Sequence, residues 1–598
     1  MNLEELVAWL TSAGGAGDSP PLSTSSENVG EEGRLILLPR PRAGALPGAS
    51  LILGPGVNLA SLGPSRSYAL DLAPSPLYAS GPAVAALLAA GAAPYAEFRL
   101  AGPGWVWDGL AGGLTPVPAS RADVFKNGRL ALAEKRGVMR FLSGAAAALG
   151  GAGEGGAAAA AGGPLSDALN SETVPLADTV AGAALPRVVA DAVVYALAGA
   201  DADQGAWEGR GGCAPPTSPP PREDRKAFPP FPLSSVPAPP AWCAAPLSGK
   251  DGGRTLSLYL NSMGRYGCGD GGAAFLVPVH GAGELPQAFA RAAAVAGGAA
   301  ALRRTAVAVE VEGEEGEDEE APSPLSAVAV HLATGQRLTC RALVAGEEVV
   351  AGAPPRAGDL ALLAPSAPAA APTAISRAII ILDGPLMPLA GEAGGAPTPP
   401  SSPAGLTTAV LVLPPRCLSP TYPPAAVRGL QAGMPTSACP AGKVVLYLSM
   451  PAVSAAGPQA DLEPALTALA RTPWNKGKDG EEVAPSPLPS VLFAAFYREP
   501  GPAPPGLAEG MPANVALLPP PTGALTAGAA AVAAAGAALD RLWPGGQVSL
   551  FPEVPREVAA PADKEGEMAA MSALPGAGDD SDEEAAAALS AALAGLDA

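Results

Sequence analysis

The sequence predicts an α/β protein in which an all-helical domain is inserted into a discontinuous α/β domain. Short apolar runs alternate with Gly/Pro turns over residues 34–98, and strand patterns return from residue 274 onward. Between these regions, four apolar residues share one helix face at i, i+3, i+4 and i+7: Val138, Phe141, Leu142 and Ala145. A helical segment between two α/β segments fits one domain inserted into another.

Composition and periodicity divide the chain into segments. The 74 glycines and 71 prolines among 598 residues mark irregular insertions, which we leave out of the core. We expect a first part of the α/β domain (1–121), a helical domain II (122–200), a Pro-rich disordered insertion (201–252), a second part of the α/β domain (253–556) and an acidic tail (557–598).

The expected elements follow in chain order. The first part holds an amphipathic stretch at 3–10, apolar runs at 35–38 and 51–53, and a helical pattern at 84–88. A second helical pattern of domain II covers 185–197. In the second part we expect helices at 286–296 and 525–542, and strands at 274–279, 305–311, 325–332, 338–345, 379–382, 409–413 and 444–448. The helix at 286–296 has proline in its first turn and ends at Gly297-Gly298.

Charge and cysteine content narrow the class of protein. The net charge of −20 repels phosphate backbones, so we expect no nucleic-acid partner. No apolar stretch reaches the roughly 20 bulky residues of a membrane span, and the acidic N-terminal residues do not resemble a secretory signal. Six cysteines without a CxxC pair predict reduced thiols, and we expect the protein in the cytosol: Cys213, Cys243, Cys268, Cys340, Cys417 and Cys439.

Residues for catalysis, metal binding and nucleotide binding are sparse. His280 and His331 are far apart, and each lies in or beside an apolar run, which favours structural roles. No HExxH, EF-hand or GxxxxGK[ST] pattern occurs, so we expect no metal, no cofactor and no catalytic residue. Residues 267–272 match GxGxxG, but a strand pattern follows where the dinucleotide motif needs a helix, which favours a loop.

One informative segment is residues 283–291 (GELPQAFAR). In a helix, three polar residues align at i, i+3 and i+7: Glu284, Gln287 and Arg291. An opposite apolar stripe is expected to pack inward: Leu285, Phe289 and Ala293. The polar stripe is either a recognition surface or an ordinary solvated face.

The other informative segment is residues 120–125 (SRADVF), followed by Glu134, Lys135 and Arg136 at the start of the amphipathic helix. Phe125 among polar neighbours is either an exposed anchor or a staple packed beneath that helix.

Taken together, these segments resemble the family of Rab escort proteins and Rab GDP-dissociation inhibitors. Residues 120–142 resemble the helical-domain start of the escort branch; residues 262–267 (SMGRYG), 275–279 and 281–291 resemble the signature that both branches share. Weaker similarity occurs at residues 68–72, 95–98, 297–298, 302–303, 335–337, 375–378 and 512–515.

The resemblance implies a flavoprotein-like α/β domain I, a helical domain II and no catalysis. It implies that domain I binds GDP-bound Rab GTPases through a platform that includes Glu284, Gln287 and Arg291, with Arg265 and Tyr266 nearby. Phe125 and Arg136 match the positions through which escort proteins contact Rab geranylgeranyltransferase. Domain II would shelter the prenyl group of the Rab, and contact with membranes would be transient.

The resemblance also implies a difference at the N-terminus. Residues 1–6 resemble the family segment that follows a first strand, a Gly-rich turn and a Tyr-Gly-Gly element, so we expect this chain to lack those features. Phe125 and the insertions favour an escort protein over a dissociation inhibitor. A flavin-dependent oxidoreductase on the related fold is the enzyme alternative, and a Pro/Ala-rich scaffold is the third.

Overall fold

The computed structural model describes most of the chain, with gaps. The described residues are 1–11, 34–37, 49–102, 104–117, 124–125, 128, 130–149, 163–201, 203–204, 246–266, 274–312, 326–347, 374–386, 408–419, 421–472, 488–499, 511–519 and 528–544. All of them belong to one compact unit, Met1–Leu550.

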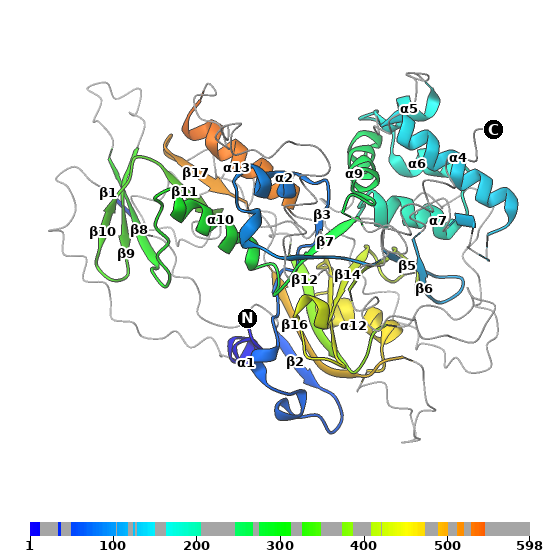
Figure 1. The fold of residues 1–598 in the computed structure, drawn as a ribbon, viewed down its shortest axis with the longest axis horizontal. Coiled ribbons are helices and arrows are strands. Elements are labelled where there is room, and N and C mark those ends of the chain that lie inside the picture. Colours follow the sequence, from blue (N-terminus) through cyan, green and yellow to red (C-terminus); the bar gives the residue numbers. More distant parts are fainter. Residues whose placement is uncertain are drawn as a thin grey trace, which may run out of the picture. The chain divides into compact units, whose positions relative to one another are not determined.

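An eight-stranded sheet forms the centre of this unit (Figure 1). Its strands lie in the order β2 (Ser50–Leu53), β16 (Val491–Glu499), β12 (Ile375–Leu382), β15 (Val444–Pro451), β14 (Val427–Ala432), β13 (Ala409–Leu413), β5 (Trp105–Asp108) and β6 (Gly113–Pro116). Neighbours pair antiparallel except β13 and β5, which are parallel. The isoleucines of β12 are buried on both faces, as their unbroken apolar run requires.

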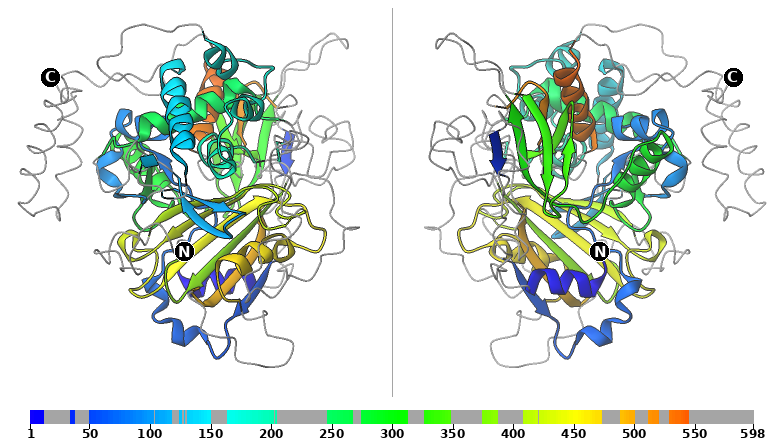
Figure 2. Two further views of the ribbon diagram at one scale, coloured as in Figure 1. Left: turned by 90° about the vertical axis from the view of Figure 1, so that its right-hand side faces the viewer. Right: turned by 90° about the vertical axis from the view of Figure 1, so that its left-hand side faces the viewer.

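Alternate residues of the sheet enter two different cores because side chains point to opposite faces of a strand. Ile380 and Leu382 pack with Leu462 and Leu466 of helix α12 (Pro458–Leu469). Ile379 and Ile381 belong to the cluster that continues into the helical layer. The sheet is therefore covered on both faces, with α12 on one side and helices on the other (Figure 2).

The helical layer consists of α4 (Leu132–Ala148), α5 (Pro164–Leu169), α6 (Leu176–Gly182), α7 (Arg187–Asp191), the π-helix η5 (Ala192–Leu197) and α9 (Gly249–Ser262). Helix α9 packs in the helical layer, whereas the sequence predicts that residues from 253 onward belong to the second part of the α/β domain. Its Leu256 is fully buried and α9 packs on α4, α5, α6 and η5. The sequence does not predict α9 because three of its residues are glycine (249, 252 and 253), which disfavours a helix.

Three smaller sheets complete the unit. One contains β3 (Leu77–Tyr78), β7 (Phe275–Pro278) and β4 (Phe98–Leu100), with α2 (Pro82–Ala89), η4 (Ala93–Tyr95) and α10 (Glu284–Val295) packed around it. A second contains β1 (Arg34–Leu37), β8 (Ala306–Glu312), β9 (Ser326–Leu332) and β10 (Arg337–Thr339). The third pairs β11 (Leu343–Gly346) with β17 (Val515–Leu518), against which α13 (Gly528–Leu542) packs.

The α/β class and most of the predicted elements are confirmed, including α1 (Leu3–Thr11) in the expected amphipathic stretch. The predicted strand at 338–345 is wrong as one element, because β10 pairs with β9 whereas β11 pairs with β17 in another sheet. The backbone N–H of Leu343 donates to the carbonyl of Asn514, which draws the chain from one sheet to the other. The expected disordered insertion and the acidic tail stay predictions: residues 205–245 and 545–598 lie outside the described part.

Candidate binding surfaces

Helix α10 forms as its sequence predicts and begins two residues earlier, at Glu284. Its inward face contains Ala288, which is 1% exposed, and the half-buried Leu285, Phe289 and Ala292. Ala293, predicted to pack inward, is exposed. At 100° per residue, Ala293 lies about 80° from Leu285, whereas Ala288 and Ala292 lie closer to the centre of the apolar face.

The polar stripe of α10 faces away from the core. Glu284 is half-buried, and Gln287 and Arg291 are exposed. No salt bridge to another described residue is formed by Glu284 or Arg291. The guanidinium of Arg291 lies 5.1 Å from the centre of the Tyr95 ring, which restricts its conformations before any partner arrives.

The predicted residues of the 262–267 motif lie around the same apolar cluster. Tyr266 packs against the cluster that contains Ala288 and Leu276, on the side chains that α10 also uses. Arg265 is exposed; its guanidinium lies 5.8 Å from the centre of the Tyr266 ring and donates to the Ser80 hydroxyl at 3.4 Å. The structure therefore brings Tyr266 together with α10, although residues 267–283 separate the two in the sequence. The GxGxxG match at 267–272 lies outside the described residues.

The loop that precedes α10 is held by a residue that sequence reasoning missed. The carboxylate of Asp71 accepts the backbone N–H of Ala282 at 2.9 Å. Burial raises the pKa of Asp71 to about 6, against the lowering effect of that hydrogen bond. The only sequence signal was weak: Asp71 lies in the segment 68–72, one of the shorter similarities to the family.

The predicted histidine roles can also be located. His331 lies 2.9 Å from a carboxylate oxygen of Glu310, a buried residue that also accepts from Arg337 at 2.7 Å. His280 is exposed, and its backbone N–H donates to the carbonyl of Thr436 at 2.9 Å. The described contacts of both histidines are structural.

Phe125 lies beside the start of α4 and is 56% exposed, whereas its neighbour Val124 is fully buried. The interpretation of Phe125 as a staple is wrong, because Val124 occupies the space beneath the helix with Val138 and Val189. The ammonium of Lys135 donates to the Phe125 carbonyl at 2.8 Å, which fixes this segment to the first turn of α4.

Arg136 is exposed in the same turn of α4 as Lys135. The turn itself is stabilised by Glu134, whose carboxylate accepts the backbone N–H of Ala131 at 2.7 Å. The exposed Phe125 therefore precedes α4, and the exposed Arg136 lies five residues into it. Sequence reasoning named both residues, and the structure shows them accessible.

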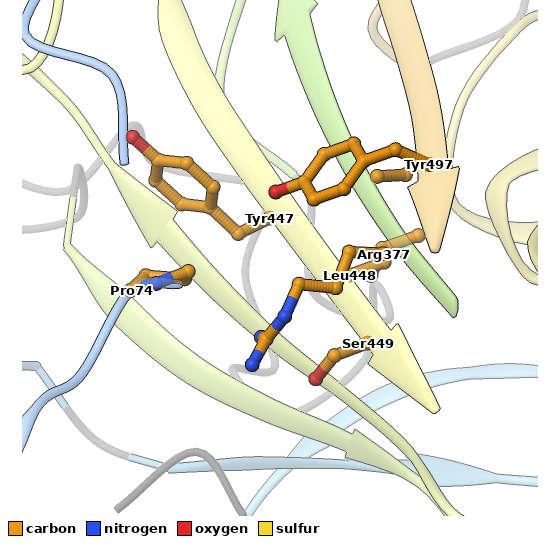
Figure 3. Close-up of a pocket in the computed structure, with 7 residues that line it drawn as sticks. Pro74, Arg377, Tyr447, Leu448, Ser449 and Tyr497 are labelled. Carbon is orange, nitrogen blue, oxygen red and sulfur yellow. The ribbon is translucent and has the colours of Figure 1, made fainter. Parts of the chain in front are cut away.

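A small hollow over the central sheet is the other feature with ionisable groups (Figure 3). It is lined by Pro74, Arg377, Ala378, Tyr447, Leu448, Ser449 and Tyr497. Burial raises the pKa values of Tyr447 and Tyr497 well above the usual range, so both phenols stay neutral. Arg377 is paired with Glu499, and the Tyr497 hydroxyl donates to the carbonyl of Leu72. Arg377, Tyr447 and Tyr497 thus have partners within the protein, whereas the buried hydroxyl of Ser449 has none among the described residues.

The helical layer is fastened to the sheet by Arg428 of β14. Its guanidinium donates to the carboxylate of Asp201 at 2.9 Å and to the carbonyls of Tyr195 and Ala200 at 3.0 and 2.9 Å. The carbonyls belong to the end of η5 and the turn after it, where helical backbone acceptors otherwise lack partners.

Comparison with known proteins defines the class of this fold. Residues 248–320, which contain α9 and α10, match the family model described as GDP dissociation inhibitor. The structure is similar to a Rab GDI from Plasmodium falciparum, with a TM-score of 0.50, 14% identity, and coverage of 82% of this chain and 86% of that chain. This chain therefore has the fold of Rab GDP-dissociation inhibitors.

Sequence similarity points to one branch of that class. The chain is 27% identical over 395 residues to Rab escort protein 1 of Arabidopsis thaliana, covering 64% of this chain and 58% of that protein. It is 28% identical over 243 residues to Rab proteins geranylgeranyltransferase component A of Drosophila melanogaster, covering 41% and 36%. The chain thus spans less than two thirds of the length of either relative. The matches confirm the resemblance to this family that the sequence predicts.

Proposed function

We propose that this chain is a non-catalytic Rab escort protein that binds GDP-bound Rab GTPases and presents them to Rab geranylgeranyltransferase. The observation that carries the proposal is the polar stripe of α10, exposed on a helix fixed by its apolar face and lying inside the segment that matches the GDP dissociation inhibitor model. A rigid, charged stripe supplies orientation and specificity to a protein partner at little conformational cost.

The Rab platform consists of Glu284, Gln287 and Arg291, with Arg265 and Tyr266 at its edge. Glu284 and Arg291 place opposite charges on one stripe, about 10 Å apart along the helix, which fixes the direction in which a partner with complementary charges binds. The Arg291 guanidinium lies over the Tyr95 ring, which restricts the side chain before binding, so less side-chain entropy is lost when a partner binds.

The transferase surface consists of Phe125 and Arg136. Phe125, which is 56% exposed, gains apolar burial when a partner covers it, and the exposed Arg136 of α4 adds hydrogen bonds with fixed geometry. When Rab and transferase are bound to one carrier, the C-terminal cysteines of the Rab meet the transferase active site at high effective concentration. The chain then carries the prenyl group of the Rab to membranes from the cytosol.

Reconstituted prenylation tests this function. Rab, geranylgeranyl diphosphate and transferase are combined with and without the chain, and geranylgeranyl incorporation is measured. We expect stimulation, and we expect Phe125→Ala to reduce it about tenfold at limiting transferase. Leu110→Ala is the matched control, because Leu110 is also 56% exposed but lies in the turn between β5 and β6.

Binding measurements separate the two surfaces. Arg291→Ala is expected to weaken Rab binding about tenfold or more, whereas Phe125→Ala leaves Rab binding unchanged. A chain that neither binds Rab nor stimulates prenylation would contradict the proposal. The structural similarity to a Rab GDI favours one second candidate, a dissociation inhibitor. Extraction of prenylated Rab from membranes without any stimulation of prenylation would identify that function instead.

A further inference from the structure

The loop between β7 and α10 leads directly into the helix that carries Glu284, Gln287 and Arg291. Its backbone is left-handed at two consecutive residues, with φ of 66° at His280 and 97° at Gly281. A left-handed conformation is unfavourable for a residue with a side chain, so the surroundings of His280 must hold it there.

Two flanking segments hold this loop. On one side the carbonyl of Thr436 accepts the backbone N–H of His280 at 2.9 Å. On the other side the carboxylate of Asp71 accepts the backbone N–H of Ala282 at 2.9 Å. Asp71 is itself fixed to the central sheet, because its backbone N–H donates to the hydroxyl of Tyr447 on β15 at 3.2 Å.

The contact between Asp71 and the loop is close. A Cβ atom added to Gly281 would lie 2.6 Å from Oδ1 and 2.8 Å from Oδ2 of Asp71. The carboxylate is therefore packed directly against the backbone of the loop at Gly281. Asp71 thus connects the central sheet to the start of α10 through one hydrogen bond to Tyr447 and one from Ala282.

The charge of this carboxylate depends on groups packed around it. The titratable groups that face it are the hydroxyls of Tyr447 and Tyr497, both neutral, and the amino group of Met1. Burial dominates and raises the pKa of Asp71 to about 6, so the carboxylate is charged at neutral pH and protonated in mild acid. A charged acceptor holds an N–H about twice as strongly as a neutral one.

We propose that Asp71 is a positioning residue for the Rab platform: its carboxylate fixes the loop before α10 and thereby aligns Glu284, Gln287 and Arg291. The inference rests on the proposed function and adds to it a residue that does not touch the partner. Arg291 lies about 10 Å along the helix axis from Glu284, so a small tilt at the loop displaces it most.

The test compares two carboxylates that each accept a backbone N–H from the loop before a helix; Asp461 also accepts the Ser376 hydroxyl and lies 3.5 Å from the Arg498 guanidinium. Asp71→Asn removes the charge at the start of α10. Asp461→Asn is the matched control, because the Asp461 carboxylate accepts the backbone N–H of Ser454 at 2.7 Å in the loop before α12, a helix without platform residues. We expect Asp71→Asn to weaken binding of GDP-bound Rab by the full chain about tenfold at neutral pH, and Asp461→Asn to leave it unchanged.

The pH profile distinguishes positioning from a loss of folding. The ratio of the Kd of Asp71→Asn to that of the wild type should fall from about ten at pH 7.5 to about one near pH 5, because wild-type Asp71 is then also neutral. Titration of the Rab itself cancels in this ratio. A ratio that stays constant with pH, or equal binding at every pH, overturns the positioning role.

Amide hydrogen exchange gives a readout that needs no Rab. We expect faster exchange of the Ala282 amide and of the first turn of α10 in Asp71→Asn, and no such change in Asp461→Asn. If the wild type fails to bind Rab but exchange changes as expected, the proposed function is wrong and the anchoring of α10 stands. If exchange is unchanged, Asp71 does not position the helix, whatever the wild type binds.

Discussion

The carboxyl group of Asp71 is harder to ionise in the folded protein than in the unfolded chain, because burial withdraws it from water. Its folded pKa of about 6 lies above the ordinary value of 3.8. Between these two pH values the folded state binds more protons than the unfolded state, so the contribution of Asp71 to stability decreases as pH rises through this window.

This shift predicts how an Asp71→Asn variant differs from the wild type. The free energy of unfolding of the variant, relative to the wild type, should rise with pH between about 4 and 6 and then level off, by up to about 3 kcal/mol. Urea denaturation across this pH range measures the difference. A difference that falls or stays flat with rising pH would show that burial does not control this carboxyl group.

Single residues were the hardest features to predict from the sequence. Phe125 and Val124 are adjacent and both apolar, and only the packing around α4 decides that Val124 is buried and Phe125 exposed. The polar stripe of α10 was predictable because its spacing alone defines a helix face. Asp71 was not, because its partner Ala282 is distant in sequence and contributes only a backbone N–H.

At the scale of elements, the glycines of α9 let its backbone pack directly against neighbouring backbone, without side chains in between. A Cβ atom at Gly253 would lie 2.5 Å from the carbonyl oxygen of Leu169, so α9 approaches α5 more closely than an alanine would allow. Gly137 in α4 is the contrasting case, since an added Cβ there meets nothing within 4 Å.

The two glycines should therefore respond to alanine with opposite signs. Gly137→Ala is expected to stabilise the protein by about 0.5–1 kcal/mol, because alanine restricts the unfolded chain and favours helix. Gly253→Ala is expected to destabilise it by about 1–3 kcal/mol, because the clash with Leu169 outweighs that gain. Thermal and chemical denaturation measure both, and stabilisation by Gly253→Ala would show that the helices can separate at little cost.

Elements with regular apolar spacing were predictable, whereas those defined by close approach were not. The buried run of β12 and the amphipathic pattern of α4 follow from their residues alone. Helix α9 and the break between β10 and β11 depend on contacts with distant segments, Leu169 for α9 and Asn514 for the break.

At the scale of the whole molecule, Arg428 joins the two layers by three hydrogen bonds from one guanidinium. Arg428→Lys is expected to lower the free energy of unfolding by about 2–4 kcal/mol, because a single ammonium cannot reach all three acceptors. Arg66→Lys, at an exposed arginine, is the control and should change stability by less than about 0.5 kcal/mol. Equal effects of the two substitutions in thermal denaturation would contradict a joint at Arg428.

The α/β class and an inserted group of helices could be predicted from the order of periodic segments. How tightly the two parts are joined could not, because an arginine in a strand pattern gives no sign of which carbonyls it will bind. The pairing of β13 with β5 could not be predicted either, because β5 precedes the inserted helices in the sequence and β13 follows them.

Arg428 is also synthesised much later than the backbone groups to which it donates hydrogen bonds. The residue lies 233 positions after Tyr195, so the end of η5 leaves the ribosome long before the guanidinium that completes its hydrogen bonds exists. Until β14 arrives, the carbonyls of Tyr195 and Ala200 depend on water, and the apolar face of the helical layer lacks the sheet that covers it. The nascent helices therefore expose apolar surface while the segment between η5 and β14 is translated. A chaperone that binds exposed apolar segments would bind the chain at this stage.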